Sequence, residues 1–99
     1  MRNSSSDVTR TEARITGRVQ GVGFRYSTME RARRLGVHGW VCNAPDVSVD
    51  LVAQGHQADV DQLVSWLRTG PSSAHVADVE LTNSTARGLT GFEIRHDCR

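Results

Sequence analysis

The fold of this 99-residue chain is decided by the stretch Gly17-Arg18-Val19-Gln20-Gly21-Val22-Gly23-Phe24-Arg25. Leading into it, apolar and polar residues alternate from Glu12 to Val19, which is typical of a half-buried strand. After it, apolar and small residues recur at steps of four, four and three from Phe24 to Leu35, as on one face of a helix. The stretch is therefore predicted to be a glycine-rich turn that joins a strand to a helix.

A turn of this kind can bind an anion. Gly21 and Gly23 allow positive φ angles and a close approach of the backbone to a ligand, and the first helical turn offers unpaired N–H groups. Arg25 falls in that turn, where its guanidinium can hold two oxygens of one phosphate or carboxylate. The alternative is that the glycines only reverse the chain and that Arg25 is solvated, and the spacing alone favours this alternative.

The stretch does not match the common nucleotide-binding loops. No Gly-Lys-Ser or Gly-Lys-Thr follows the glycines, and Tyr26 stands where a dinucleotide-binding motif needs a small residue. Nucleotide binding is therefore disfavoured.

The remaining chain predicts one more helix and four more strands. The strands are expected at 37–43, 47–54, 74–81 and 92–96, and the helix at 56–68. The order β-α-β-β-α-β, followed by a short edge strand, predicts an α+β two-layer ferredoxin-like sandwich with two helices on one face of an antiparallel sheet. This topology places Arg25 near Asn43, at the end of the second strand.

The composition fits one small domain. The formal net charge is +1, and every basic residue is an arginine, so nucleic-acid binding is not expected. No apolar run approaches the roughly 18 residues that span a membrane, and the polar start lacks the apolar segment of a secretory signal. We expect a cytoplasmic monomer with a disordered tail at 1–10 and a folded domain at 11–99.

The cysteines and histidines do not suggest a metal site. No Cys-x-x-Cys or His-Glu-x-x-His spacing occurs, so neither a metal nor another cofactor is expected. Cys42 and Cys98 could form a disulfide only if the C-terminal segment lay beside the second strand. A reducing cytoplasm favours two free thiols instead.

Two segments resemble the signatures of the acylphosphatase family. The first resemblance is carried by Gly17, Val19, Gln20, Gly21, Val22, Gly23, Phe24 and Arg25, with Leu35-Gly36 closing the helix. The second is carried by Gly39-Trp40-Val41-Cys42-Asn43, followed by Val49 and Gly55. Further matches extend the resemblance over the chain beyond the first ten residues: Trp66, Gly70, Pro71, Ala74, Val76, Phe92, Ile94 and Arg95.

The resemblance implies an acylphosphatase, an enzyme that hydrolyses small-molecule acyl phosphates to a carboxylate and inorganic phosphate. It implies that Arg25 binds the substrate phosphate and that Asn43 positions water, although Asn43 by itself is more typical of a turn. The chemistry adds a phosphate-binding cradle formed by the backbone N–H groups of Gln20, Gly21, Val22, Gly23, Phe24 and Arg25.

Two positions depart from the family pattern. Cys42 stands where a basic residue is usual, and Val47 stands where the hairpin usually has glycine. If position 47 needs a positive φ angle, a β-branched residue there costs roughly 1–2 kcal/mol. The resulting alternative is a non-catalytic anion-binding module that keeps the cradle but does not orient water. An RNA-binding sheet is the weaker alternative, since the alternating aromatic residues of such a sheet are missing.

Overall fold

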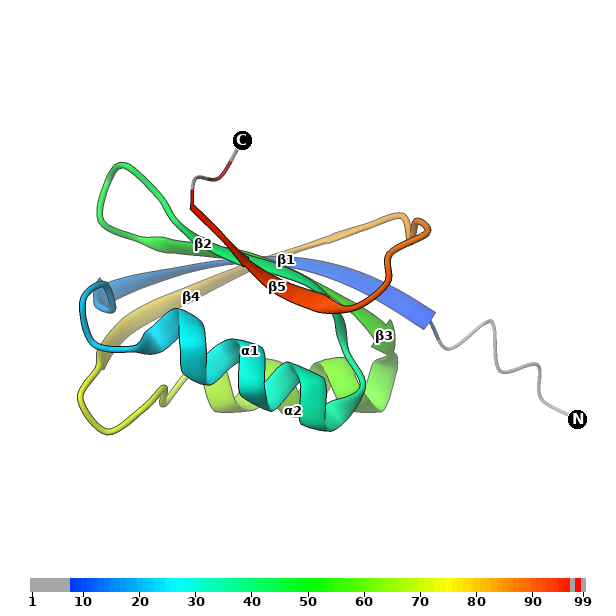
Figure 1. Ribbon diagram of the computed structural model, residues 1–99, viewed down its shortest axis with the longest axis horizontal. Helices are drawn as coiled ribbons and strands as arrows, with labels where there is room; N and C mark the ends of the chain where they lie inside the picture. Colours follow the sequence, from blue (N-terminus) through cyan, green and yellow to red (C-terminus); the bar gives the residue numbers. More distant parts are fainter. Residues whose placement is uncertain (1–7, 97, 99) are drawn as a thin grey trace, which may run out of the picture.

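A computed structural model describes residues 8–96 and Cys98 (Figure 1). The elements follow the predicted order, with strands, helices and bounds as follows: β1 Val8–Arg18, α1 Phe24–Leu35, β2 His38–Asn43, β3 Val49–His56, α2 Gln57–Leu67, β4 His75–Ser84 and β5 Phe92–Arg95. Among the described residues, no helix is long and apolar enough to cross a membrane.

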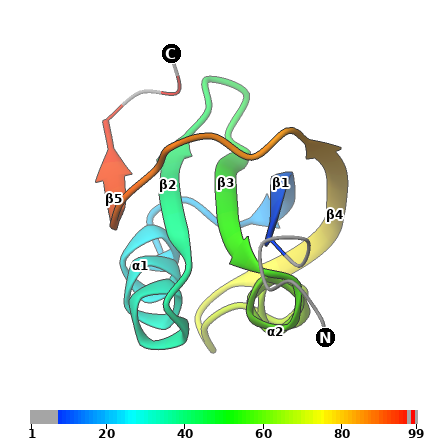
Figure 2. The same ribbon diagram turned by 90° about the vertical axis from the view of Figure 1, so that its right-hand side faces the viewer.

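The strands form one sheet in the order β4-β1-β3-β2-β5, and both helices cover the same face of it (Figure 2). The predicted α+β two-layer sandwich is confirmed, and the last strand does lie at an edge. One detail differs, because β5 runs parallel to β2 while the other three pairs are antiparallel, so the sheet is mixed. The cause is the segment after β4, which crosses from one edge of the sheet to the other before β5 begins (Figure 2).

The core lies between the sheet and the helices. Alternate side chains of the strands point into it, as period-two patterns require. Its fully buried members include Ile15, Val41, Val49, Leu63 and Leu67. Large aliphatic residues of this kind contribute roughly 1.5–3 kcal/mol each when buried. This packing fixes where each strand ends and therefore where the loops of the site lie.

Helix α1 has the predicted bounds and is anchored at its start. Gly23 adopts φ 78° as the residue before the helix, and Gly36 adopts φ 75° as the residue after it. Phe24 is 1% exposed and packs against Trp66, with ring centroids 5.8 Å apart. The turn before α1 is thus attached to the core through the first residue of the helix.

Two strands begin at residues other than those expected. Strand β1 begins at Val8, and Arg10 is buried within it. The division of the chain at residue 11 stays a prediction. Residues 1–7 of the expected tail lie outside the described residues. Strand β3 begins at Val49 because Val47 belongs to the preceding turn, where it has φ 66° and is 66% exposed.

The expected pair of free thiols was also wrong, since Cys42 and Cys98 form a disulfide with Cα atoms 5.4 Å apart. The parallel pairing of β5 with β2 places Arg95 opposite Cys42. The C-terminal segment therefore returns to the second strand, which is the arrangement a disulfide requires.

Candidate active site

Arg25 and Asn43 line the same pocket, a hollow of about 140 Å³. Arg25 comes from the first turn of α1 and Asn43 is the last residue of β2. The β1–α1 loop and the β2–β3 turn lie at the same end of the sheet (Figure 1). The topology thus brings together the two residues expected to act on a substrate. The full lining is Val19, Gly21, Gly23, Phe24, Arg25, Tyr26, Asn43 and Ile94.

The start of α1 is open to an anion. Its first turn contains no acidic residue, and no side chain caps it. The unpaired N–H groups and the helix dipole there favour negative charge. Gly21 and Gly23 have φ angles of 74° and 78°, and an added Cβ at either position would meet nothing within 4 Å. The backbone of this loop is therefore accessible to a ligand.

Not every residue expected in the cradle lines the pocket. Gly21, Gly23, Phe24 and Arg25 do, whereas Gln20 and Val22 are absent from the lining. The Nε2 atom of Gln20 donates instead to the carbonyl oxygens of two residues of the β2–β3 turn. The carbonyl oxygen of Val22 accepts a hydrogen bond from a serine hydroxyl in the α2–β4 loop at 2.9 Å. These two residues hold the loop in place from outside the pocket.

Asn43 presents a free acceptor. Its Oδ1 atom is buried and accepts no hydrogen bond from the described part of the chain. A buried polar atom left unpaired costs about 1–3 kcal/mol, so such atoms in folded proteins call for an explanation. An amide oxygen beside an anion-binding loop can accept a hydrogen bond from a water molecule and orient it.

Sequence reasoning gave no role to Val19, Tyr26 or Ile94 in this pocket. Ile94 lies there because β5 pairs in parallel with β2, opposite Val41, and no local pattern predicts that pairing. Tyr26 could have been found, because it directly follows Arg25 in the same helical turn. Its hydrogen bond to Glu30 raises the pKa of the Tyr26 hydroxyl above its usual value.

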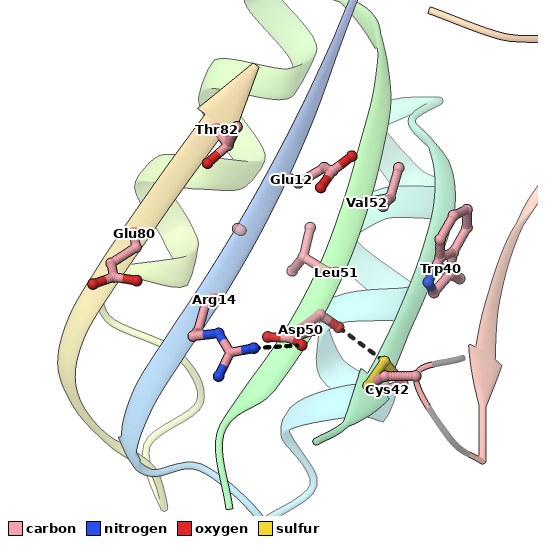
Figure 3. A pocket seen from close by; sticks show the side chains of 11 residues that line it. Glu12, Arg14, Trp40, Cys42, Asp50, Leu51, Val52, Glu80 and Thr82 are labelled. Atoms are coloured by element: carbon pink, nitrogen blue, oxygen red, sulfur yellow. Dashed lines mark hydrogen bonds and ion pairs between the residues drawn. A yellow bond between two sulfur atoms is a disulfide. The ribbon is translucent and has the colours of Figure 1, made fainter. Parts of the chain in front are cut away.

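A larger pocket of about 290 Å³ lies on the face of the sheet that the helices leave open (Figure 3). It is a poor anion site because its lining contains Glu12, Asp50 and Glu80 against the single cation Arg14. The Arg14 guanidinium is already paired, at 2.7 Å with Asp46 and 3.2 Å with Asp50. The smaller pocket at the helix start is therefore the candidate active site.

A metal-binding arrangement is also missing from residues 8–96 and Cys98, where no three histidine, cysteine or acidic side chains gather to hold an ion. The expectation of a metal-independent reaction remains a prediction.

The sandwich and its pocket define a small α+β protein with a candidate anion-binding site at a helix start. A family model described as acylphosphatase matches residues 11–94. The chain is 46% identical over 90 residues to an acylphosphatase of Trichormus variabilis, covering 91% of this chain and 89% of that protein. It is 48% identical over 85 residues to an acylphosphatase of Thermococcus kodakarensis, covering 86% and 93%. The chain belongs to the acylphosphatase family, which confirms the resemblance of its two signatures.

The fold agrees with this assignment. The structure superposes on that of an acylphosphatase from Coxiella burnetii with a TM-score of 0.89 at 33% identity, over 96% of this chain and all of that one. The predicted enzyme class, a hydrolase of the acylphosphatase family, is therefore confirmed.

Proposed function

We propose that this acylphosphatase cleaves acyl phosphates in the pocket shared by Arg25 and Asn43, giving a carboxylate and inorganic phosphate. The observation that carries the proposal is that one pocket brings an uncapped helix start and the Arg25 guanidinium together with Asn43, whose buried amide oxygen has no hydrogen-bond partner among the described residues. In the described part of the chain no carboxylate forms an ion pair with Arg25, so its charge is available to a substrate.

The phosphoryl group binds at the start of α1. Backbone N–H groups of the loop from Gly21 to Phe24 and the Arg25 guanidinium hold its oxygens. These donors offset the negative charge on the three oxygens in a loose transition state, and their geometry is fixed before the substrate arrives. Phe24, which is buried against the core, keeps the loop from shifting during the reaction.

Asn43 orients the attacking water. Its Oδ1 accepts one hydrogen bond from the water, whose oxygen then attacks phosphorus in line with the bond that breaks. The P–O bond to the acyl group breaks and its electron pair leaves on the carboxylate, while the water releases a proton to solvent. A carboxylate is a stable leaving group because the pKa of its acid is about 4, so the reaction needs no strong general acid.

Hydrolysis of benzoyl phosphate, with inorganic phosphate as a competitive inhibitor, tests the proposal. We expect turnover, competitive inhibition by phosphate and no loss of activity with a chelator. A protein that binds phosphate but fails to hydrolyse benzoyl phosphate would instead be the non-catalytic anion-binding module. A crystal soaked with sulfate that leaves this pocket empty and holds the anion elsewhere would contradict the assigned pocket.

The monomeric state belongs to the same proposal, with a small acyl phosphate as the partner, and the cytoplasmic location is a separate prediction that requires Cys42 and Cys98 to be reduced. The disulfide argues against a reducing compartment, in which such bonds are rare. Trapping thiols during cell lysis gives a direct test, since a cytoplasmic protein is expected to carry Cys42 and Cys98 reduced. Light scattering on a sizing column tests the monomer.

A further inference from the structure

The candidate pocket has an apolar side that the proposed hydrolysis does not use. Val19, Phe24, Tyr26 and Ile94 line it together with the anion-binding groups. Val19 and Phe24 are each 1% exposed, so they form a floor with little surface left for a ligand. Tyr26 is 57% exposed and Ile94 is half-buried, so these two side chains can contact a bound molecule.

The two reachable side chains come from different elements. Tyr26 follows Arg25 in the first turn of α1. Ile94 of β5 lies opposite Val41 of β2. Residues two apart on a strand face the same way, so Ile94 shares its face of the sheet with Asn43. The pocket is therefore lined by Tyr26 from the same helical turn as Arg25 and by Ile94 from the same sheet face as Asn43.

We propose that Tyr26 and Ile94 bind the acyl group, and that the enzyme favours acyl phosphates whose acyl group is uncharged and apolar, either aromatic or branched. This inference rests on the proposed function. Once the phosphoryl group occupies the loop at the start of α1, only the acyl part of the substrate remains to contact these side chains.

The surroundings of Tyr26 disfavour an acyl group that carries a second carboxylate. Such a group would be placed against apolar surface, where an unpaired charge is costly. The Glu30 carboxylate also lies at the Tyr26 hydroxyl, where its hydrogen bond raises the pKa of that hydroxyl.

The test compares kcat/KM for acetyl, benzoyl and succinyl phosphate, which offer a small, an aromatic and a charged acyl group. The measured quantity is the ratio of benzoyl to acetyl phosphate in each variant divided by the same ratio in the wild type. This quotient cancels the different intrinsic reactivities of the two substrates. We expect Tyr26→Ser and Ile94→Ala each to lower it about three- to tenfold, since lost apolar contacts of this size weaken binding by that order.

Leu81→Ala is the matched control. Leu81 is also an exposed apolar strand residue at 42%, but it lies in β4 at the opposite edge of the sheet. Its quotient is expected to stay at one. Ile94→Val, which removes a single methyl group, should lower the quotient by a smaller factor. It replaces Ile94→Ala in the comparison if Ile94→Ala fails to fold.

The outcomes separate this inference from the proposed function. A wild-type protein that hydrolyses none of the three substrates overturns both. A wild-type protein that is active but prefers succinyl to benzoyl phosphate overturns only the acyl-site inference. The same holds if Tyr26→Ser and Ile94→Val leave the quotient at one.

Discussion

The Nε2 atom of Gln20 donates a hydrogen bond to the carbonyl oxygen of Ala44 at 2.9 Å, which joins the loop before α1 to the turn after Asn43. A second hydrogen bond of 2.9 Å runs from the same atom to the carbonyl oxygen of Ser48. The amide of Ala44 also donates to that Ser48 oxygen at 2.8 Å. One side chain thus connects the loop that receives the phosphoryl group to the turn that follows the water-orienting residue.

Gln20→Ala is expected to lower kcat more than it raises KM. The loop and the turn can then shift relative to each other, and a misplacement of about 1 Å at a reacting centre costs up to ~100-fold in rate. Two lost hydrogen bonds also reduce the free energy of unfolding by about 1–3 kcal/mol. Steady-state kinetics on benzoyl phosphate and urea unfolding measure the two effects.

Gln57→Ala is the control for Gln20, because Gln57 bonds only to the exposed Asp61 among the described residues, at 2.8 Å on α2. It should leave both kcat and stability close to wild type. A Gln20→Ala enzyme with wild-type kcat would show that the connection does not position Asn43.

Arg25→Ala and Asn43→Ala are expected to differ in their effects on phosphate affinity and turnover. Without Arg25 the phosphoryl group loses its charged partner, so phosphate affinity and turnover should fall together, turnover by about 1000-fold or more. Without Asn43 the water loses its orientation, so kcat should fall about 100-fold while the inhibition constant for phosphate changes little. Arg34→Ala, a change at an exposed arginine of the same helix, is the control. If both variants lost phosphate binding equally, the assigned roles would be wrong.

Val47→Gly is expected to stabilise the protein by about 0.5–1 kcal/mol. Val47 has φ 66°, in the left-handed region where a side chain costs about 1–2 kcal/mol, and glycine offsets part of that gain through its larger unfolded-state entropy. Val8→Gly is the matched control, since Val8 is exposed within β1 and the same change should destabilise there. Thermal unfolding of both variants measures the difference. A loss of stability in Val47→Gly would contradict the prediction that the positive φ angle of Val47 destabilises the fold.

The elements that local patterns determine were predictable. Helix α1 was found from its repeating apolar face and the glycines at its ends, and its bounds agree with the structure. The proximity of Arg25 to Asn43 followed from the β-α-β order, because β1 and β2 both pair antiparallel with β3 and therefore finish at the same end of the sheet. The sequence therefore predicted that Arg25 and Asn43 lie close together, although it did not predict the other residues that line the pocket.

Features that depend on distant contacts were not predictable in this way. Val47 continues the alternation of Val49 and Leu51, so it was expected in a strand, but the Asp46 side chain accepts hydrogen bonds from the Ser48 amide and hydroxyl and holds a turn there. The direction of β5 depends on the crossing of residues 85–91, which has no pattern of its own. The disulfide and the place of Ile94 in the pocket depend in turn on that direction.

Asp46 and Asp50 both pair with Arg14, yet their pKa values shift in opposite directions. Hydrogen bonds from Ser48 hold the pKa of Asp46 below its usual 3.8, whereas burial raises the pKa of Asp50 above it despite Arg14. Ionised Asp46 therefore adds stability above pH 3.8, which is lost as the pH falls through its lowered pKa. Ionised Asp50 costs stability above its raised pKa, and that cost vanishes as the pH falls below 3.8.

The two asparagine variants should consequently show opposite pH effects. Asp46→Asn is expected to be less stable than wild type at pH 7, with the difference shrinking in acid. The free energy of unfolding of Asp50→Asn is expected to rise relative to that of the wild type as the pH rises from about 3 to 7. Urea unfolding at the two pH values provides the measurement. Equal pH dependence in both variants would refute the opposite shifts.

Reduction of the Cys42–Cys98 disulfide is expected to destabilise the fold. The two cysteines are 56 residues apart, and closing a loop of that length restricts the unfolded chain by about 4 kcal/mol in the chain-entropy account. Disulfides typically contribute about 2–4 kcal/mol, so the urea midpoint should fall clearly when a reductant is added. The double variant Cys42→Ala, Cys98→Ala is the control, and its urea midpoint should be the same low value with and without reductant.

The disulfide could also affect catalysis, because Cys42 directly precedes Asn43 in β2. Measuring kcat with and without reductant shows whether the disulfide also fixes the water-orienting residue. A midpoint that the reductant leaves unchanged in the wild type, while mass spectrometry shows the bond cleaved, would mean that strand pairing alone holds the C-terminal segment beside β2.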